Sequence, residues 1–462
     1  MNNAMLEVVN PFDLKPIDAV PLAHWNDIDR YLDTAQQLYQ NRTAWMPAHQ
    51  RVGILQKAAV LMQGRFDELA YLIANEGGKP LVDARVEVTR AIDGVKLCIE
   101  EIPNLAGKQI PMDLSPAGAG RTAFTQREPI GPVVAVSAFN HPLNLIVHQV
   151  APAVATGCPV LVKPADDTPL SCRAFVDILL EAGLPEEWCR FVPCDIPTAE
   201  KLVTDPRVAF FTFIGSGKVG WMLRSKLAPG TRCALEHGGA APVIIDESAD
   251  IEQMIPSLVK GGFYHSGQVC VSVQRVFAPS GMADDIARMI SDQAEKLIVG
   301  NAVNEDTDAG PLIRPREVDR VAQWVQQAKD TGAQVLTGGK KLGDTTYAPT
   351  VLVRPSETAQ VSRQEIFGPV ICVYDYTDMD AAITQANSLP FAFQASVYSK
   401  NLDIAMQAVQ KLDATAVMVN DHTAFRVDWM PFAGRRQSGY GTGGIGYTMH
   451  DMTQAKMSVF KL

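Results

Sequence analysis

Short runs of β-branched and aromatic residues alternate with stretches of helical periodicity along most of the chain, and this alternation restricts the fold more than any other feature. Before Cys270 the short runs include VVAVS, PVLVK, VAFFTFI and PVIID, separated by helical stretches such as CRAFVDILLEAG. After Cys270 a second series follows, with RVFAP, GPVICVYDY and AVMVN as its strands. Strands that alternate with helices pair in parallel through crossover helices, so we predict two α/β units.

The chain from about Trp25 to Glu101 shows helical periodicity, with a break at Gly77-Gly78, and predicts a helical N-terminal layer. No Asp, Glu, Lys or Arg occurs from Pro129 to Val162, which is long enough for a membrane span. Several prolines interrupt this stretch, however, and a buried strand-loop-helix-strand segment fits it better. We therefore expect no membrane partner.

The bulk composition narrows the function further. A chain of 462 residues exceeds one ordinary core and suggests two or three domains. The net charge of −10 argues against a nucleic-acid partner, because such proteins present a basic surface. The N-terminus has no apolar core of signal-peptide length, and the eight cysteines are scattered without metal-ligand spacing. We expect reduced thiols, no metal and a cytoplasmic location.

A glycine-rich turn follows one predicted strand and opens a helical stretch. The sequence Gly-Ser-Gly-Lys-Val-Gly at 215–220 comes directly after VAFFTFI, which is the context that the dinucleotide-binding G-x-G-x-x-G pattern requires. Glycines there let backbone N–H groups approach a pyrophosphate at a helix N-terminus. Such turns also arise for packing reasons, so the motif alone leaves both readings open.

Two residues beyond this turn are candidates for chemistry. Glu236 lies near the position, about twenty residues on, where the same pattern expects an acidic ribose ligand. Cys270 follows a predicted turn at Gly267-Gln268, and His265 nearby suggests a Cys/His pair. A surface carboxylate and an inert buried thiol are the plain alternatives.

Taken in order and spacing, the motifs resemble those of the aldehyde dehydrogenase superfamily over nearly the whole chain. The residues that carry the resemblance are Gly77 to Pro80, Asn140, Lys163-Pro164, Phe213 to Gly220, Glu236 to Gly239, Gly267 to Cys270, Glu365 to Pro369 and Pro431 to Gly439. The resemblance implies an α/β fold with a Rossmann-like cofactor domain (1–107 and 128–237), a catalytic α/β domain (238–436) and a small β oligomerisation flap (108–127 and 437–462). It also implies a homodimer or homotetramer.

By this resemblance the chain oxidises an aldehyde through a thiohemiacetal on Cys270. Asn140 matches the oxyanion-hole asparagine, which acts together with the Cys270 backbone N–H. Glu236 matches the general base that activates water to hydrolyse the thioester, and this role replaces that of a ribose ligand. His237 stands next to it where the family usually has Leu. The alternatives are a CoA-acylating semialdehyde dehydrogenase, against which Glu236 argues, and a catalytically silent homologue.

The resemblance also implies NAD(P) as the coenzyme. Lys163 and Asp166 match the partners of the adenosine ribose hydroxyls. A carboxylate at this position favours NAD, because it repels a 2′-phosphate, but Asp is shorter than the Glu that the family often has, which leaves NADP open.

Further coenzyme contacts follow from the same resemblance. Gly215 and Ser216 match the pyrophosphate-binding turn, and Val219 would lie against the adenine. Glu365 and Phe367 resemble the pair that holds the nicotinamide ribose and packs beside the ring.

The substrate side is marked by departures from the family pattern. Phe139 and His141 flank Asn140 where many members carry Trp and a larger apolar residue, and we expect them to shape the tunnel. FNHPLNL and RVDWMP are similar to the lactaldehyde and phosphonoacetaldehyde dehydrogenase branch. Arg426 would bind a carboxylate, phosphonate or sulfonate of a small or anionic aldehyde, unless it pairs with Asp428 or another carboxylate as part of the structure.

Overall fold

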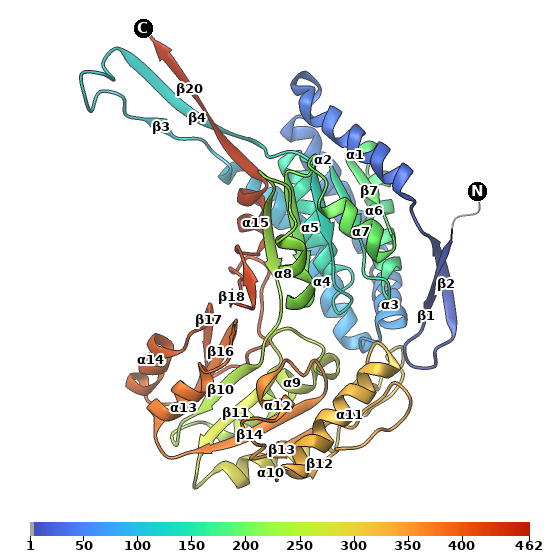
Figure 1. The fold of residues 1–462 in the computed structure, drawn as a ribbon, viewed down its shortest axis with the longest axis vertical. Helices are drawn as coiled ribbons and strands as arrows, with labels where there is room; N and C mark the ends of the chain where they lie inside the picture. The colour runs from blue at the N-terminus through green and yellow to red at the C-terminus, as the bar shows by residue number, and fades with distance from the viewer. Residues whose placement is uncertain (1–3) are drawn as a thin grey trace.

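The computed structural model describes residues 4–462, and two sheets of mostly parallel strands form its two halves (Figure 1). The strand order is β19-β9-β8-β5-β6-β7 in the first sheet and β12-β13-β14-β11-β10-β16-β17 in the second. The two predicted α/β units are therefore confirmed, and each half has its own buried apolar core.

The first sheet joins five parallel strands to one short antiparallel edge strand. Its strands are β5 (Val133–Val136), β6 (Val160–Lys163), β7 (Cys189–Phe191), β8 (Phe210–Ile214), β9 (Arg232–Glu236) and β19 (Gly439–Tyr440). The central strands β5, β6 and β8 are almost entirely buried. Parallel strands covered on both faces need apolar residues on both faces, which explains the continuous hydrophobic runs in the sequence.

The helices of this half include the predicted N-terminal layer. They are α1 (Trp25–Gln40), α2 (Ala48–Gly64), α3 (Phe66–Gly77), α4 (Leu81–Glu101), α5 (Asn144–Thr156), α6 (Pro169–Glu181), α7 (Ile196–Val203), α8 (Gly217–Arg224) and α15 (Ile445–Asp451). The predicted break is confirmed: Gly78 adopts a φ of 66° at the end of α3, and Pro80 precedes α4.

The uncharged stretch forms β5, α5 and β6 in succession, as predicted. Every residue of α5 is buried, so the helix runs through the core of the first half. Among the residues that the structure describes, no helix combines the length and apolar character needed to cross a bilayer.

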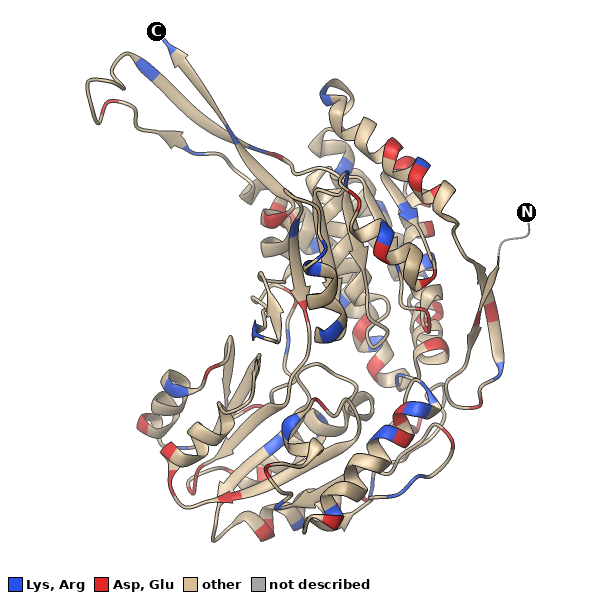
Figure 2. Ribbon diagram, in the orientation of Figure 1, with Lys and Arg blue, Asp and Glu red and all other residues tan. Residues whose placement is uncertain are grey.

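The second sheet is parallel except for its edge strand β12, which pairs antiparallel with β13. Its strands are β10 (Ala241–Ile245), β11 (Val273–Pro279), β12 (Gln334–Thr337), β13 (Thr350–Val353), β14 (Val370–Tyr376), β16 (Gln394–Tyr398) and β17 (Ala416–Val419). Its helices are α9 (Ile251–Phe263), α10 (Ala283–Ala294), α11 (Pro315–Asp330), α12 (Gln360–Arg363), α13 (Met379–Ala386) and α14 (Leu402–Lys411). Acidic and basic residues are interspersed on the outer helices of both halves (Figure 2).

A three-stranded antiparallel sheet projects from the first half (Figure 1). It consists of β3 (Gln109–Ile110), β4 (Arg121–Pro129) and β20 (Thr453–Lys461), and we call it the flap. Within the predicted C-terminal flap segment, only β20 enters this sheet: β19 joins the first sheet, and α15 packs against α4 and α5. Two short pairs complete the structure, β1 (Met5–Val9) with β2 (Pro16–Pro21) and β15 (Phe391–Ala392) with β18 (Arg435–Arg436).

Candidate active site

A cavity of about 540 Å³ lies where the strands β5, β6, β8 and β9 end, and loops of the second half line its other side. Residues at the carboxyl ends of parallel strands meet at one edge of a sheet, which brings together segments far apart in the sequence. All of the predicted site residues line this one cavity: Phe139, Asn140, His141, Lys163, Asp166, Gly215, Ser216, Val219, Glu236, Cys270, Glu365, Phe367 and Arg426.

Cys270 reaches the cavity because the chain turns sharply after α9. Three successive residues, His265, Ser266 and Gly267, have φ values of 48°, 54° and 70°, in the left-handed region. A Cβ on Gly267 would collide with the carbonyl oxygen of Gly368, so only glycine fits there. The side chain of Gln268 then fixes the turn by accepting from the Ile313 N–H across 3.0 Å. The thiol is thus placed by a constrained backbone rather than by a regular element.

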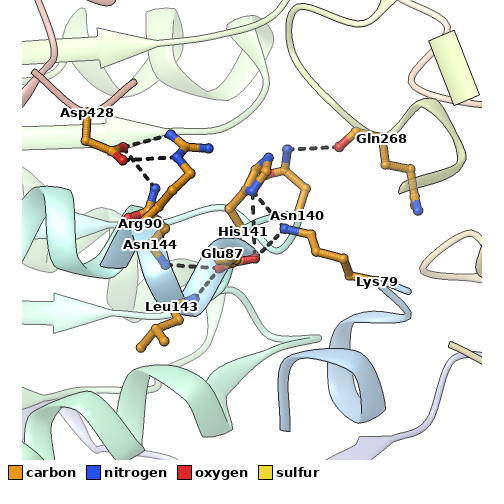
Figure 3. A network of polar contacts seen from close by, with 9 residues as sticks. All are labelled: Lys79, Glu87, Arg90, Asn140, His141, Leu143, Asn144, Gln268 and Asp428. Atoms are coloured by element: carbon orange, nitrogen blue, oxygen red, sulfur yellow. Dashed lines mark hydrogen bonds and ion pairs between the residues drawn. The ribbon is translucent and has the colours of Figure 1, made fainter. Parts of the chain in front are cut away.

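Asn140 is buried beside this turn. Its Nδ2 donates to the backbone carbonyl of Gln268 across 2.9 Å (Figure 3). A side-chain amide carries two N–H donors, so one remains for an oxygen in the cavity. Asn140 therefore has the chemistry and the place that an oxyanion-binding group next to Cys270 requires.

Charged side chains of both signs lie near the Cys270 thiol. Burial raises its pKa to about 12; the Arg426 charge lowers the pKa, whereas the carboxylates of Glu365 and Glu236 raise it further. Without a ligand the group is therefore a neutral thiol at neutral pH. It needs a base or a change in its surroundings to become a nucleophile.

Glu236 is the last residue of β9, and its carboxylate faces the cavity. Burial raises its pKa, and the charge of Arg426 opposes that rise. A Cβ on Gly443 would collide with the Glu236 carboxylate, so this glycine makes the room that the side chain occupies. A carboxylate with a raised pKa beside a thiol has the chemistry of a general base.

The predicted Cys/His pair is not formed, and that interpretation was wrong. Both ring nitrogens of His265 are buried without a hydrogen-bond partner among the described residues, and its ring packs beside Tyr264. Burial, assisted by the Lys79 charge, lowers the pKa of His265 well below its usual value. The left-handed conformation at 265 turns this side chain into the core, so His265 is a packing residue of the turn.

The glycine-rich turn connects β8 to α8 as the pattern predicts, with Gly215 and Ser216 before the first helical residue. Across the same cavity, Lys163 at the end of β6 forms an ion pair with Asp166. Ser216 and Val219 are exposed towards it. The N–H groups of Gly215 and Val219 already donate to the carbonyls of Glu236 and Ser216. The Ser216 side chain and the Lys163–Asp166 pair are therefore the groups that this surface offers to a ligand.

Glu365 and Phe367 line the cavity near Cys270, on the loop before β14. Phe367 has a φ of 46° and packs its ring edge-on against Phe139 at 5.8 Å. Burial raises the pKa of Glu365 to about 8, and its Oε1 has no hydrogen-bond partner among the described residues. This oxygen is buried against Gly238 beside the cavity, and a buried carboxyl oxygen without a partner can form a hydrogen bond with a ligand hydroxyl.

Arg426 also lines the cavity, half-buried and without an ion-pair partner in the described part of the chain. Its Nε has no hydrogen-bond partner, its guanidinium lies 3.6 Å from the centre of the Phe432 ring, and its Nη2 lies 3.4 Å from His148 Nδ1. The expected structural alternative, a pair with Asp428, is not present, because Arg90, His148 and Asn144 hold that carboxylate.

His141 is backed by a buried ion pair between Lys79 and Glu87 (Figure 3). Lys79 Nζ lies 2.7 Å from His141 Nδ1, and the Glu87 Oε1 accepts from the backbone N–H groups of Leu143 and Asn144. Burial and the charges of Lys79 and Arg90 lower the pKa of His141 well below its usual value. A neutral imidazole that accepts at Nδ1 carries its proton on Nε2, which makes His141 a donor toward the cavity.

Sequence reasoning missed Arg90, which also lines the cavity. A signal was present: Asp83, Glu87 and Arg90 follow one another at helical spacing on the face of α4 that is otherwise apolar. Charged residues on a buried helix face are paired or functional, and here they serve the ion pairs behind the cavity.

Comparison with known proteins gives one consistent result. The sequence model described as the aldehyde dehydrogenase family matches residues 1–458. The 3-sulfolactaldehyde dehydrogenase of Priestia aryabhattai is 34% identical, over 99% of this chain and 95% of that protein. The lactaldehyde dehydrogenase of Methanocaldococcus jannaschii is 32% identical, over 99% and 97%.

Solved structures agree with these sequence relatives. Aldehyde dehydrogenase 21 of Physcomitrella patens, in complex with the reaction product succinate, superposes with a TM-score of 0.96 at 35% identity, covering 100% of this chain and 95% of that chain. A glyceraldehyde-3-phosphate dehydrogenase of Methanocaldococcus jannaschii, complexed with NADP, gives a TM-score of 0.94 at 32% identity, covering 99% of each chain.

Proposed function

The chain belongs to the aldehyde dehydrogenase family, and we propose that it oxidises a small aldehyde with an anionic group to the carboxylic acid, with NAD or NADP as hydride acceptor. The observation that carries the substrate class is the half-buried Arg426, which lines the cavity of Cys270, has a buried Nε without a partner and forms no ion pair with a carboxylate among the described residues. A partly buried cation without a counter-ion is costly, so an anionic ligand would complete this site.

In the proposed reaction the Cys270 thiol releases its proton to water in the cavity, and the sulfur attacks the aldehyde carbon while the carbonyl oxygen takes the negative charge. The free N–H of Asn140 and the backbone N–H of Cys270 stabilise that charge. The bound coenzyme supplies the acceptor for the hydride that leaves the tetrahedral carbon. A thioester then remains on Cys270.

Glu236 is the proposed base for the second half of the reaction. Its carboxylate takes a proton from water, which attacks the thioester carbon and releases the acid and the thiol of Cys270. Burial raises the pKa of Glu236, so its affinity for a proton suits this task. A CoA-dependent release is the alternative, and it would not need this base.

We propose that the coenzyme lies along the glycine-rich turn. Ser216 would hold its pyrophosphate at the N-terminus of α8, where Gly215 allows close approach because it has no side chain, and Val219 would lie against the adenine. Lys163 and Asp166 would bind the adenosine ribose. The orphaned Oε1 of Glu365 fits a ribose hydroxyl near Cys270, with Phe367 beside the nicotinamide.

The anionic group of the substrate would lie between Arg426, Arg90 and His141. Arg90 uses its Nε and Nη2 for Asp428 and keeps further donors for the cavity. Phe139 would cover the apolar part of a short substrate. The anionic substrate of the Priestia relative and the succinate in the Physcomitrella structure are consistent with this arrangement.

The test combines purified protein, NAD or NADP, and a panel of aldehydes: 3-sulfolactaldehyde, lactaldehyde, phosphonoacetaldehyde, succinate semialdehyde and propionaldehyde. We expect reduced coenzyme with the anionic members at the lowest KM, and none with the Cys270→Ala variant. Continued turnover in that variant, or a preference for propionaldehyde, would overturn the proposal.

The flap is our candidate for an oligomer contact, in a homodimer or homotetramer. Met457, Val459 and Phe460 of β20 are about half exposed, and most of the flap is uncharged (Figure 2). Exposed apolar strands with open edges need a partner to cover them. We also propose a cytoplasmic location, because all eight cysteines are free thiols. Light scattering of the full chain and of a variant with Phe460→Glu tests the contact.

A further inference from the structure

His237 is a buried imidazole directly after the proposed base, at the end of β9. Only 3% of the residue is exposed, and its Nδ1 lies 2.8 Å from the carbonyl oxygen of Gly215. A carbonyl only accepts, so Nδ1 carries the proton and Nε2 a lone pair. Nε2 has no partner among the described residues, and burial lowers the pKa of His237. The ring is therefore a neutral donor aimed at the glycine-rich turn.

This hydrogen bond ties the glycine-rich turn to Glu236, the proposed base. We call the two bonds that join Gly215 to the Glu236-His237 pair the latch. The Gly215 N–H donates to the Glu236 carbonyl across 3.0 Å, so both backbone polar groups of Gly215 are bound by the Glu236-His237 pair. The His237 N–H in turn donates to the Ser438 carbonyl across 3.0 Å. The turn cannot shift relative to Glu236 without breaking one of these bonds.

The ring also fills the space under the first turn of α8. It packs edge-on to Phe213, with ring centres 5.7 Å apart, and 5.9 Å from the ring centre of Trp221. A Cβ on Gly220 would collide with the His237 ring, so the glycine at 220 is matched to the imidazole at 237. A leucine at 237 would fill the same space but could not donate to Gly215.

We propose that His237 is a positioning residue for the coenzyme, which holds the Gly215 carbonyl so that the turn at 215–219 stays fixed toward the coenzyme's phosphates and in register with Glu236. This inference rests on the coenzyme site proposed above. His237 acts through the turn and not on the reacting atoms. Without the His237 N–H donor, the turn is more mobile, and coenzyme binding must order it. The affinity for the coenzyme therefore falls more than the rate of the chemical step does.

Two substitutions separate the donor from the ring. His237→Asn keeps an N–H donor near the Nδ1 position, and His237→Phe keeps a ring without a donor. We would titrate each full-length variant with NADH and NADPH and follow coenzyme fluorescence. Loss of a buried hydrogen bond predicts a Kd raised about tenfold in His237→Phe, against at most about threefold in His237→Asn.

A second readout distinguishes positioning from general damage. Coenzyme KM should rise in His237→Phe in parallel with Kd, while kcat at saturating coenzyme falls at most about twofold, because the binding loss is uniform. Equal Kd values in His237→Phe and the wild type, equal losses in both variants, or a loss confined to kcat would each overturn the inference.

If His237→Phe fails to fold, Gly220→Ala tests the same hydrogen bond, because it changes the residue that lies against the His237 ring. The added methyl group should push the ring off Gly215 and raise Kd about tenfold, but at most about threefold in the His237→Asn background, where there is room. Equal effects in both backgrounds would contradict the latch. Val219→Glu is the control for the coenzyme site itself. If the coenzyme Kd is unchanged in Val219→Glu, the proposed coenzyme site is wrong. If the Kd rises in Val219→Glu but is unchanged in His237→Phe, only the latch is wrong.

Discussion

Asp428 is bound to Arg90 and not to Arg426, although it lies only two residues from Arg426 in the chain. Arg90 donates from Nε and Nη2 across 3.0 and 2.7 Å, and His148 Nε2 and Asn144 Nδ2 contact the same carboxylate at 2.7 and 3.2 Å. Burial alone would raise the pKa of Asp428, but these partners hold it well below its usual value. The carboxylate is fully used, and the charge of Arg426 remains available to the cavity.

Arg426→Ala should therefore act on substrate affinity in a way that depends on charge. We expect KM for succinate semialdehyde or 3-sulfolactaldehyde to rise about 10- to 100-fold, the value of one charge-assisted hydrogen bond. KM for propionaldehyde should change by no more than about threefold, since a neutral aldehyde leaves the guanidinium unused. Steady-state kinetics with both substrates measure this.

The matched control is Arg435→Ala, which removes an exposed arginine on the same C-terminal segment. It should leave both KM values unchanged. If Arg426→Ala weakens the neutral and the anionic substrate equally, Arg426 is a structural residue and the substrate class must be revised.

Glu236→Gln should separate the two halves of the reaction. Acylation of Cys270 and hydride release need no hydrolytic base, so a rapid burst of reduced coenzyme, about one per active site, should persist. The following steady state should slow about 10²- to 10⁴-fold, because the water has lost its general base. Stopped-flow absorbance resolves both phases. An unchanged steady state would show that Glu236 is not the base, and recovery by added CoA would favour the acylating alternative.

The sequence was sufficient to predict both α/β units, because a strand that is buried on both faces appears in the sequence as a continuous run of apolar residues. It also predicted the local turns at Gly78 and Gly215, where backbone geometry restricts residue type. The glycine at 443 is different. It gives Glu236 its room, but nothing in its neighbourhood reveals that a side chain more than two hundred positions away lies against it.

Charge pairing was the least predictable part of the site. Arg90 and Asp428 are 338 positions apart, and Lys79 and His141 are 62 apart, so periodicity within either segment carries no information on the pair. Nearness in sequence was misleading instead: it suggested pairs for Arg426 with Asp428 and for Cys270 with His265, and neither forms. The resemblance to a family brought the cavity residues together where local patterns could not.

Asp166 offers a test of coenzyme choice. Its carboxylate is paired with Lys163, which reduces but does not remove its repulsion of a 2′-phosphate. Asp166→Ser should improve kcat/KM for NADP relative to NAD by about tenfold, because a hydroxyl tolerates the phosphate and frees the lysine to bind it. The comparison needs both coenzymes at one ionic strength.

The neighbouring carboxylate is the control for this substitution. Asp167 is held by Arg314 across 2.6 Å, which reduces the effect of its charge as Lys163 does for Asp166. Asp167→Asn should leave the NADP-to-NAD ratio within about twofold of the wild type, since no ribose contact is assigned to it. A ratio that moves equally in both variants would mean that general surface charge, not the ribose contact, sets the preference.

Glu365 should shape the pH dependence of Cys270 reactivity. Burial raises the pKa of Glu365 to about 8, and its ionised form raises the pKa of the Cys270 thiol. As pH rises through 8, Glu365 gains its charge and opposes formation of the thiolate. In the wild type the alkylation rate by iodoacetamide should therefore climb less than about tenfold per pH unit while Glu365 titrates around pH 8.

Glu365→Gln removes that charge and lowers the pKa of Cys270, so its alkylation should be faster than in the wild type above pH 8 and equal below about pH 7, where Glu365 is protonated in any case. Cys270→Ala supplies the background from the half-buried Cys233, which is to be subtracted. Superimposable profiles would mean that the two groups do not interact. A slower alkylation in Glu365→Gln would mean that Glu365 does not raise the pKa of the Cys270 thiol. Another side chain would then have to limit ionisation of that thiol.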